Sequence, residues 1–156
     1  MSHVKTTVPS IVIIVLAVLT ALIALGAVVS RSSSVDITRP RLERDVAHSY
    51  ANQYVEQQRL LGKRASAPHA TAKCTKGGPT VADQGPGKDW VCAVSWTSTD
   101  TSDRGESRYE VGARTEACYT ATDPKLTASH QFVRAQATGK DVDNPLYQFD
   151  GCFNVN

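Results

Sequence analysis

The sequence lacks the short patterns by which catalytic sites are usually recognised. It has no G-x-S-x-G nucleophile elbow and no C-x-x-C pair, so serine-hydrolase and thiol-exchange chemistry have no support in it. The segment Gly85-Pro86-Gly87-Lys88 is followed by Asp89, where a phosphate-binding loop has Ser or Thr and then a helix. We therefore predict that the chain is not an enzyme, has no catalytic residues and needs no cofactor.

Clustered metal ligands and an excess of charge are missing too. Residues 141–144 lack the central Gly and the distal Glu of a calcium loop. The four histidines lie far apart along the chain, which gives no zinc-ligand spacing; they are His3, His48, His69 and His130. After Ser30, sixteen basic and fifteen acidic residues leave a net charge of +1. We expect no metal site, and a nearly neutral domain has no basic face for nucleic acid.

Charge is absent altogether from residues 11–29. A helix of about 20 apolar residues crosses a hydrocarbon core of about 30 Å, so we predict an uncleaved transmembrane anchor in the lipid bilayer. The alternative is a cleaved signal peptide, whose apolar region is usually about 7–15 residues long. The best cleavage site, at Ala24-Leu25-Gly26, lies inside the apolar run, and this disfavours cleavage.

The anchor divides the chain into four parts. We expect a cytoplasmic tail at residues 1–10, the anchor at 11–29, a polar spacer at 30–39 and one domain at 40–156. The remaining length suits one domain with a modest core.

The orientation of the anchor has evidence on both sides. Basic residues favour the cytoplasmic side of a membrane, and four of them follow the anchor while only Lys5 precedes it; they are Arg31, Arg39, Arg41 and Arg44. The cysteines favour the opposite orientation, because four unclustered cysteines in a small domain form disulfides that persist in oxidising compartments. We predict a single-pass plasma-membrane protein with its domain outside the cytoplasm. A cytoplasmic domain with reduced cysteines stays open.

One long amphipathic helix is predicted after the spacer. Pro40 suits the first turn of a helix, and Gly62 suits its end. Between them an apolar stripe recurs at helical spacing from residue 41 to 61; it comprises Leu42, Val46, Tyr50, Tyr54 and Leu61.

The period of the pattern changes to two after a linker at residues 65–70. Residues 88–97 alternate and place Trp90, Cys92, Val94 and Trp96 on one face. We expect a return strand at residues 107–121 and further strands at 130–137 and 146–155. The sum is an α+β domain in which the helix packs on a four- to five-stranded antiparallel sheet. By analogy, this is a cystatin- or NTF2-like roll, with both tryptophans buried against the helix.

The hairpin also bears on the pairing of Cys74, Cys92, Cys118 and Cys152, for which three connectivities exist. A turn near Ser102 places Cys92 opposite Gly112, too far from Cys118 for a bridge. Of the other two pairings, Cys74–Cys92 with Cys118–Cys152 closes the shorter loops, and we predict it.

In plan, the chain resembles the small single-pass, membrane-anchored exported domains of bacteria, a class without a catalytic signature. The resemblance is carried by the apolar run 11–29, the helix 41–61 and the segment from Cys74 to Asp89-Trp90-Val91-Cys92. It implies no catalytic residues.

Two functions remain. The first is a tethered interaction module, such as an accessory subunit of a cell-envelope complex with a protein partner. The second is a small-ligand domain with an apolar pocket between helix and sheet. Its expected contacts are Tyr50, Tyr54, Trp90 and Trp96.

Overall fold

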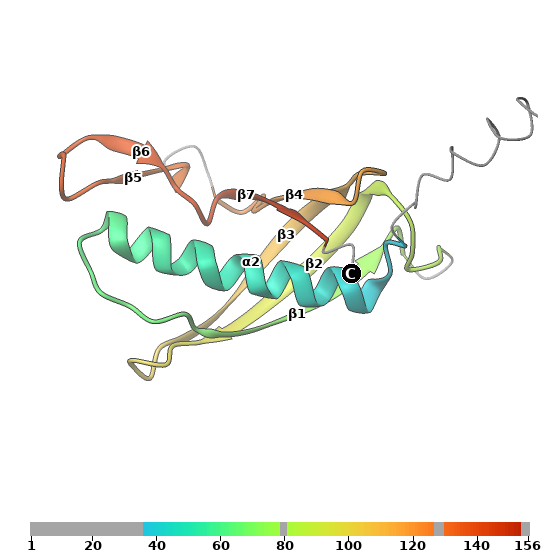
Figure 1. The fold of residues 1–156 in the computed structure, drawn as a ribbon, viewed down its shortest axis with the longest axis horizontal. Helices are drawn as coiled ribbons and strands as arrows, with labels where there is room; N and C mark the ends of the chain where they lie inside the picture. Colours follow the sequence, from blue (N-terminus) through green and yellow to red (C-terminus); the bar gives the residue numbers. More distant parts are fainter. Residues whose placement is uncertain (1–35, 79–80, 127–129, 154–156) are drawn as a thin grey trace, which may run out of the picture. The chain divides into compact units, whose positions relative to one another are not determined.

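The computed structural model describes residues 36–78, 81–126 and 130–153 (Figure 1). The expected tail, the anchor at 11–29 and most of the spacer lie outside these residues. Within them, no helix is both long enough and apolar enough to cross a membrane.

Helix α2 (Arg39–Leu60) begins and ends close to where the sequence predicts. Pro40 occupies its first turn, where a missing N–H costs nothing. At the other end, Gly62 adopts φ +71°, and the Lys63 amide donates to the Gln58 carbonyl at 2.8 Å. This left-handed turn is the common way for a helix to satisfy its last carbonyls.

Five antiparallel strands form the main sheet, in the order β1-β2-β3-β4-β7. Their bounds are β1 (His69–Lys76), β2 (Gly87–Thr97), β3 (Arg104–Ala113), β4 (Cys118–Thr122) and β7 (Gln148–Cys152). A separate pair, β5 (Phe132–Arg134) and β6 (Asp141–Asp143), forms a small hairpin. Helix α2 lies along the sheet and contacts β1 and β7, the two edge strands, as well as β2 (Figure 1). The predicted α+β class, one helix on a five-stranded antiparallel sheet, is confirmed.

Several expected strand boundaries were wrong. The expected return strand 107–121 is two strands, β3 and β4, joined by a turn at residues 114–117. That turn contains no Gly or Pro to announce it; instead Ala117 takes φ 63°. Strand β1 begins at His69, inside the expected linker 65–70, and the expected strand 130–137 shrinks to the three residues of β5. Short strands with small or polar side chains carry a weak period-2 signal.

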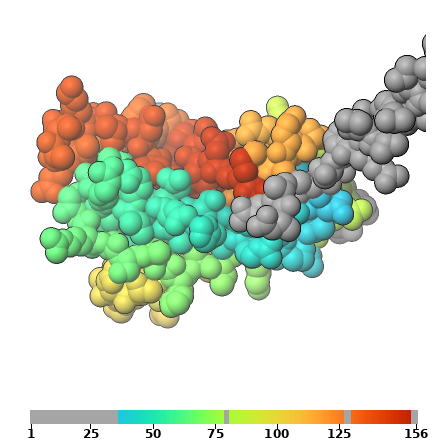
Figure 2. All heavy atoms as spheres, viewed as in Figure 1, coloured from blue at the N-terminus to red at the C-terminus, as the bar shows by residue number. Residues whose placement is uncertain are grey.

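The core lies between α2 and the inner face of the sheet. Trp90 is fully buried, and the rings of Tyr50 and Tyr109 meet edge to face with centroids 6.2 Å apart. Trp96 was expected to be buried in the same way but is only half-buried, because it lies one residue before the end of β2, at the margin of the core. Its ring instead packs on Tyr54, with centroids 5.2 Å apart. Figure 2 shows the outer surface of α2 between the C-terminal strands, in red, and the green segment that contains β1.

Both predicted disulfides are present, and each joins residues directly opposite each other on neighbouring strands. Cys74 pairs with Cys92 across β1 and β2, and Cys118 pairs with Cys152 across β4 and β7. The expected hairpin register was three positions off, since Cys92 faces Tyr109 rather than Gly112. Strand β3 begins three residues earlier than expected, at Arg104.

Candidate binding groove at the edge of the sheet

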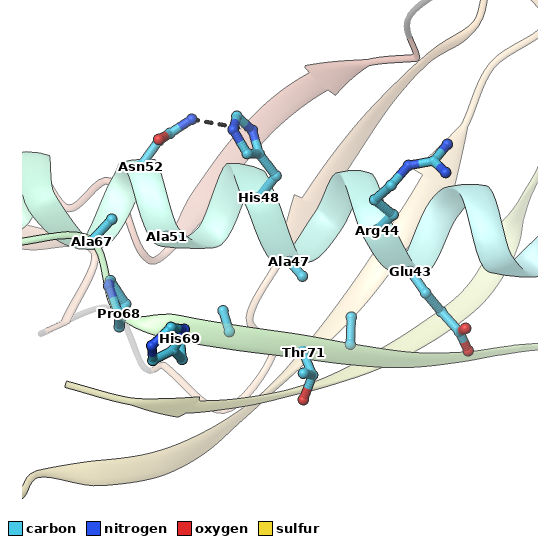
Figure 3. A pocket seen from close by; sticks show the side chains of 12 residues that line it. Glu43, Arg44, Ala47, His48, Ala51, Asn52, Ala67, Pro68, His69 and Thr71 are labelled. Carbon is cyan, nitrogen blue, oxygen red and sulfur yellow. Dashed lines mark hydrogen bonds between the residues drawn. The ribbon is translucent and has the colours of Figure 1, made fainter. Parts of the chain in front are cut away.

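A groove runs between α2 and the edge strand β1 (Figure 3). Its volume is about 560 Å³. Six of its lining residues come from the helix and six from the segment that leads into and forms β1; they are Glu43, Arg44, Ala47, His48, Ala51, Asn52, Ala67, Pro68, His69, Ala70, Thr71 and Ala72. The groove therefore follows the free side of an edge strand.

Backbone groups of β1 alternate between its neighbour β2 and this free side. The Cys74 amide donates to Glu43 Oε1 at 3.0 Å, so it points away from β2. In an antiparallel pair the direction of N–H and C=O groups alternates along the strand. Ala72 and Ala70 are two and four positions before Cys74, so their amides and carbonyls point the same way, into the groove.

The two halves of this edge differ in how their backbone groups are satisfied. Glu43 accepts from the Cys74 amide, and Asp83 Oδ1 accepts from the Lys76 amide at 2.8 Å. In the described part of the chain, no protein group accepts a hydrogen bond from the amide of Ala70 or Ala72. Exposed edge strands invite pairing by another strand, and here only the first half is left available.

Small side chains line this half of the groove. Ala47 and Ala51 come from the helix, and Ala70 and Ala72 from β1. Figure 3 shows Glu43 and Ala47 pointing from the helix toward β1, while Thr71 points away from the helix. Because alanines project so little, the backbone of an added strand could approach β1 without a steric clash.

Polar side chains form the rim of the groove on the helix side. Arg44, His48 and Asn52 are exposed, and Asn52 Nδ2 lies 3.4 Å from His48 Nδ1 (Figure 3). Such a rim around an apolar floor is the common anatomy of protein interfaces.

None of the aromatic residues expected to contact a ligand or partner lines this groove. Trp90 belongs to the core, where its Nε1 donates to the Gly85 carbonyl at 3.1 Å. Tyr50 is also buried, and Tyr54 and Trp96 pack on each other at the far end of β2. Tyr50 and Trp96, but not Trp90, line a second cavity between α2 and the sheet.

Buried tyrosines in this core keep their protons well above neutral pH. Burial raises the pKa of Tyr50 to about 12, although its hydrogen bond with Ser107 works in the opposite direction. Burial likewise raises the pKa of Tyr109, and raises that of Tyr119 to about 12 against a hydrogen bond to Ser49 at 2.9 Å. These phenols therefore serve as neutral hydrogen-bond groups of the core.

In the described residues, no group of three or more His, Cys, Asp or Glu side chains lies close enough together to bind one metal ion. The sequence did not predict this groove, because strand β1 (HATAKCTK) carries no large apolar side chain that would have marked it as a strand. The alternation of alanine with polar residues along β1 was the one feature of the sequence that indicated this strand.

Comparison of the chain with protein-family models, with curated proteins and with solved structures finds no match.

Proposed function

We propose that the chain is a membrane-tethered, extracytoplasmic interaction module without catalytic activity, which binds an extended segment of a protein partner along the β1 edge. The observation that carries the proposal is the half-open edge: the amides of Ala70 and Ala72 point into a groove with alanine walls, whereas carboxylates bind those of Cys74 and Lys76. Adding a strand to a free edge is a common mode of peptide recognition, in which main-chain hydrogen bonds supply affinity.

The groove also suggests which segments fit. The open stretch is short, because Glu43 blocks it at Cys74. The alanines that line it favour a partner strand whose inward-facing side chains are small, since large side chains need deeper pockets for burial. We therefore expect a short, extended segment rich in Ala, Ser, Thr or Gly.

Tethering and compartment rest on the sequence and on the cysteines. The uncharged run 11–29 is long enough to anchor the chain in a plasma membrane. Two disulfides suit an oxidising environment. They support a domain outside the cytoplasm, whereas the count of flanking arginines favours the opposite orientation. The helix held between the two edge strands is also the arrangement that we expect of a cystatin- or NTF2-like roll.

A proline substitution tests the edge directly. Ala72→Pro removes one N–H on the free side of β1 and leaves the pairing of β1 with β2 intact, as proline on an edge strand generally does. The matched control is Thr71→Ala, which changes the neighbouring side chain on the outer face and keeps every backbone group. Both full-length variants are purified from membranes in a mild detergent with their bound proteins.

The proposal predicts a stoichiometric partner on the parent protein and on Thr71→Ala, and its loss from Ala72→Pro. Equal recovery of the partner on all three would refute binding at this edge. Self-association that Ala72→Pro abolishes would identify a second copy of the chain as the added strand and would replace the partner proposed here.

A further inference from the structure

A second cavity lies on the other side of the core from the groove and shares no lining residue with it. It has a volume of about 340 Å³ between α2, β2, β3 and the segments that flank β5 and β6. This size is within the range of small-molecule sites, about 300–1,000 Å³. The cavity is therefore a site separate from the proposed partner edge.

Five of the twelve lining residues have aromatic or aliphatic side chains. Trp96 contributes a half-buried indole, and Tyr50 and Tyr109 reach it from the core. Tyr54 packs against the indole with ring centroids 5.2 Å apart. The backbone of Gly105 lies so close to the ring that a Cβ atom there would come within 3.0 Å of it. Leu126 and Leu146 complete the apolar part of the lining.

Polar groups in the wall are mostly committed to the protein itself. Asn144 accepts from Gln57 Nε2 at 2.8 Å and donates to the His130 carbonyl at 2.9 Å. The Tyr109 hydroxyl donates to the Leu146 carbonyl at 2.9 Å. These bonds fix the shape of the cavity before any ligand enters it.

Asp123 supplies the charge. It lines the cavity and is only 6% exposed. Its Oδ1 accepts a hydrogen bond from the Lys125 amide at 2.8 Å. His130 and the exposed Glu106 also line the cavity, and among the described residues no Lys or Arg side chain forms an ion pair with Asp123 or lines the cavity. Tyr50 and Tyr109 line the same cavity. Burial and a neighbouring tyrosine raise the pKa of each of these phenols, and the negative charge of Asp123 raises it further.

We propose that this cavity binds a small organic cation, whose ammonium group lies between the Asp123 carboxylate and the indole of Trp96. A buried carboxylate that no Lys or Arg side chain pairs with is costly, so a cation gains from it while an anion is repelled. An indole face attracts the same cation through its quadrupole, and the leucines accommodate a short alkyl chain. A primary amine can in addition donate hydrogen bonds to Asp123 and to the phenol oxygen of Tyr50.

The two tryptophans of the chain make a direct experiment possible. Full-length protein labelled with ¹⁵N-tryptophan, in a non-ionic maltoside detergent that carries no ammonium group, gives one indole N–H signal for Trp96 and one for Trp90. Trp90 is an internal control, because its indole donates to Gly85 inside the core. Three ligands of similar size are titrated: butylammonium, pentanol and pentanoate.

Butylammonium is expected to shift the Trp96 signal in a saturable manner and to leave the Trp90 signal in place. Pentanol should bind more weakly and pentanoate not at all. Asp123→Asn keeps the acceptor for the Lys125 amide and removes the charge, so it should weaken butylammonium binding about tenfold, the scale of one charged hydrogen bond. Glu110→Gln removes an exposed charge from β3 and should change nothing.

Equal shifts with pentanol and butylammonium would overturn the proposal, as would a Trp96 signal that butylammonium leaves unmoved. The comparison of the three ligands decides the question in the parent protein even if Asp123→Asn does not fold. Ala72→Pro should retain butylammonium binding, so failure at the β1 edge and failure in this cavity are distinguishable.

Discussion

The two tryptophans should contribute very differently to stability, although the sequence places them on one face of one strand. Trp90 is 0% exposed and its indole N–H is bonded to Gly85. Trp90→Ala should therefore cost about 3–5 kcal/mol, the usual scale for removing a buried aromatic ring. Trp96 is only half-buried, so Trp96→Ala should cost about 2 kcal/mol in lost burial.

Thermal unfolding of the full-length variants, followed by near-ultraviolet circular dichroism with the disulfides intact, measures this difference. For a domain of this size, 1 kcal/mol corresponds to about 4 °C in Tm. The expected falls in Tm are therefore about 12–20 °C for Trp90→Ala and about 8 °C for Trp96→Ala. Phe132→Ala is the control, because Phe132 is 52% exposed and its loss should cost less than about 1 kcal/mol.

The result that refutes the reasoning is a Trp96→Ala variant as unstable as Trp90→Ala. Trp96 would then be covered in solution, and the cavity beside it would be closed. A Trp90→Ala variant with an unchanged Tm would contradict the assignment of the core itself.

Three further predictions concern chemistry and the sheet edge. Under native conditions a mild thiol reductant should open Cys118–Cys152 first, because Cys152 is exposed, while the buried Cys74–Cys92 bridge resists until the domain unfolds; alkylation and mass mapping reveal the order. Burial raises the pKa of Tyr50 to about 12 in the folded state, above about 10 in the unfolded chain. The contribution of Tyr50 to the free energy of unfolding is therefore complete below pH 10 and is lost as pH rises to about 12. Denaturant titrations across this range should show a fall in stability that is smaller in Tyr50→Phe. Glu43→Ala removes the acceptor of an edge amide and should cost about 1 kcal/mol while lengthening the open edge, and increased self-association on size-exclusion chromatography is the expected sign.

The helix and the strand that show a clear apolar repeat could be predicted from the sequence alone. Helix α2 follows from its apolar spacing together with Pro40 and Gly62, and β2 follows from the alternation around Trp90. The disulfide pairing was also predicted correctly, although the register used to reach it was three residues off.

The missed features depend on weak or non-local information. Strand β1 has alanines where a strand usually shows larger apolar residues, and the turn before β4 places Ala117 at positive φ without a glycine to mark it. The groove could not be foreseen, because it depends on which strand ends at the edge and on where Glu43 of a distant helix reaches that edge. Asp123 could not be singled out from the sequence, because its proposed role in binding depends on its burial, which residue spacing does not show.

The most direct test of the half-open edge is amide hydrogen exchange in the free full-length protein, followed residue by residue along β1. Thr71 and Lys73 point their amides at β2 and should exchange slowly, as should Cys74, whose amide is bonded to Glu43. Ala70 and Ala72 should exchange fast, and should become protected when a partner strand is bound. Slow exchange at Ala70 and Ala72 in the free protein would contradict the account, because the edge would then already be covered.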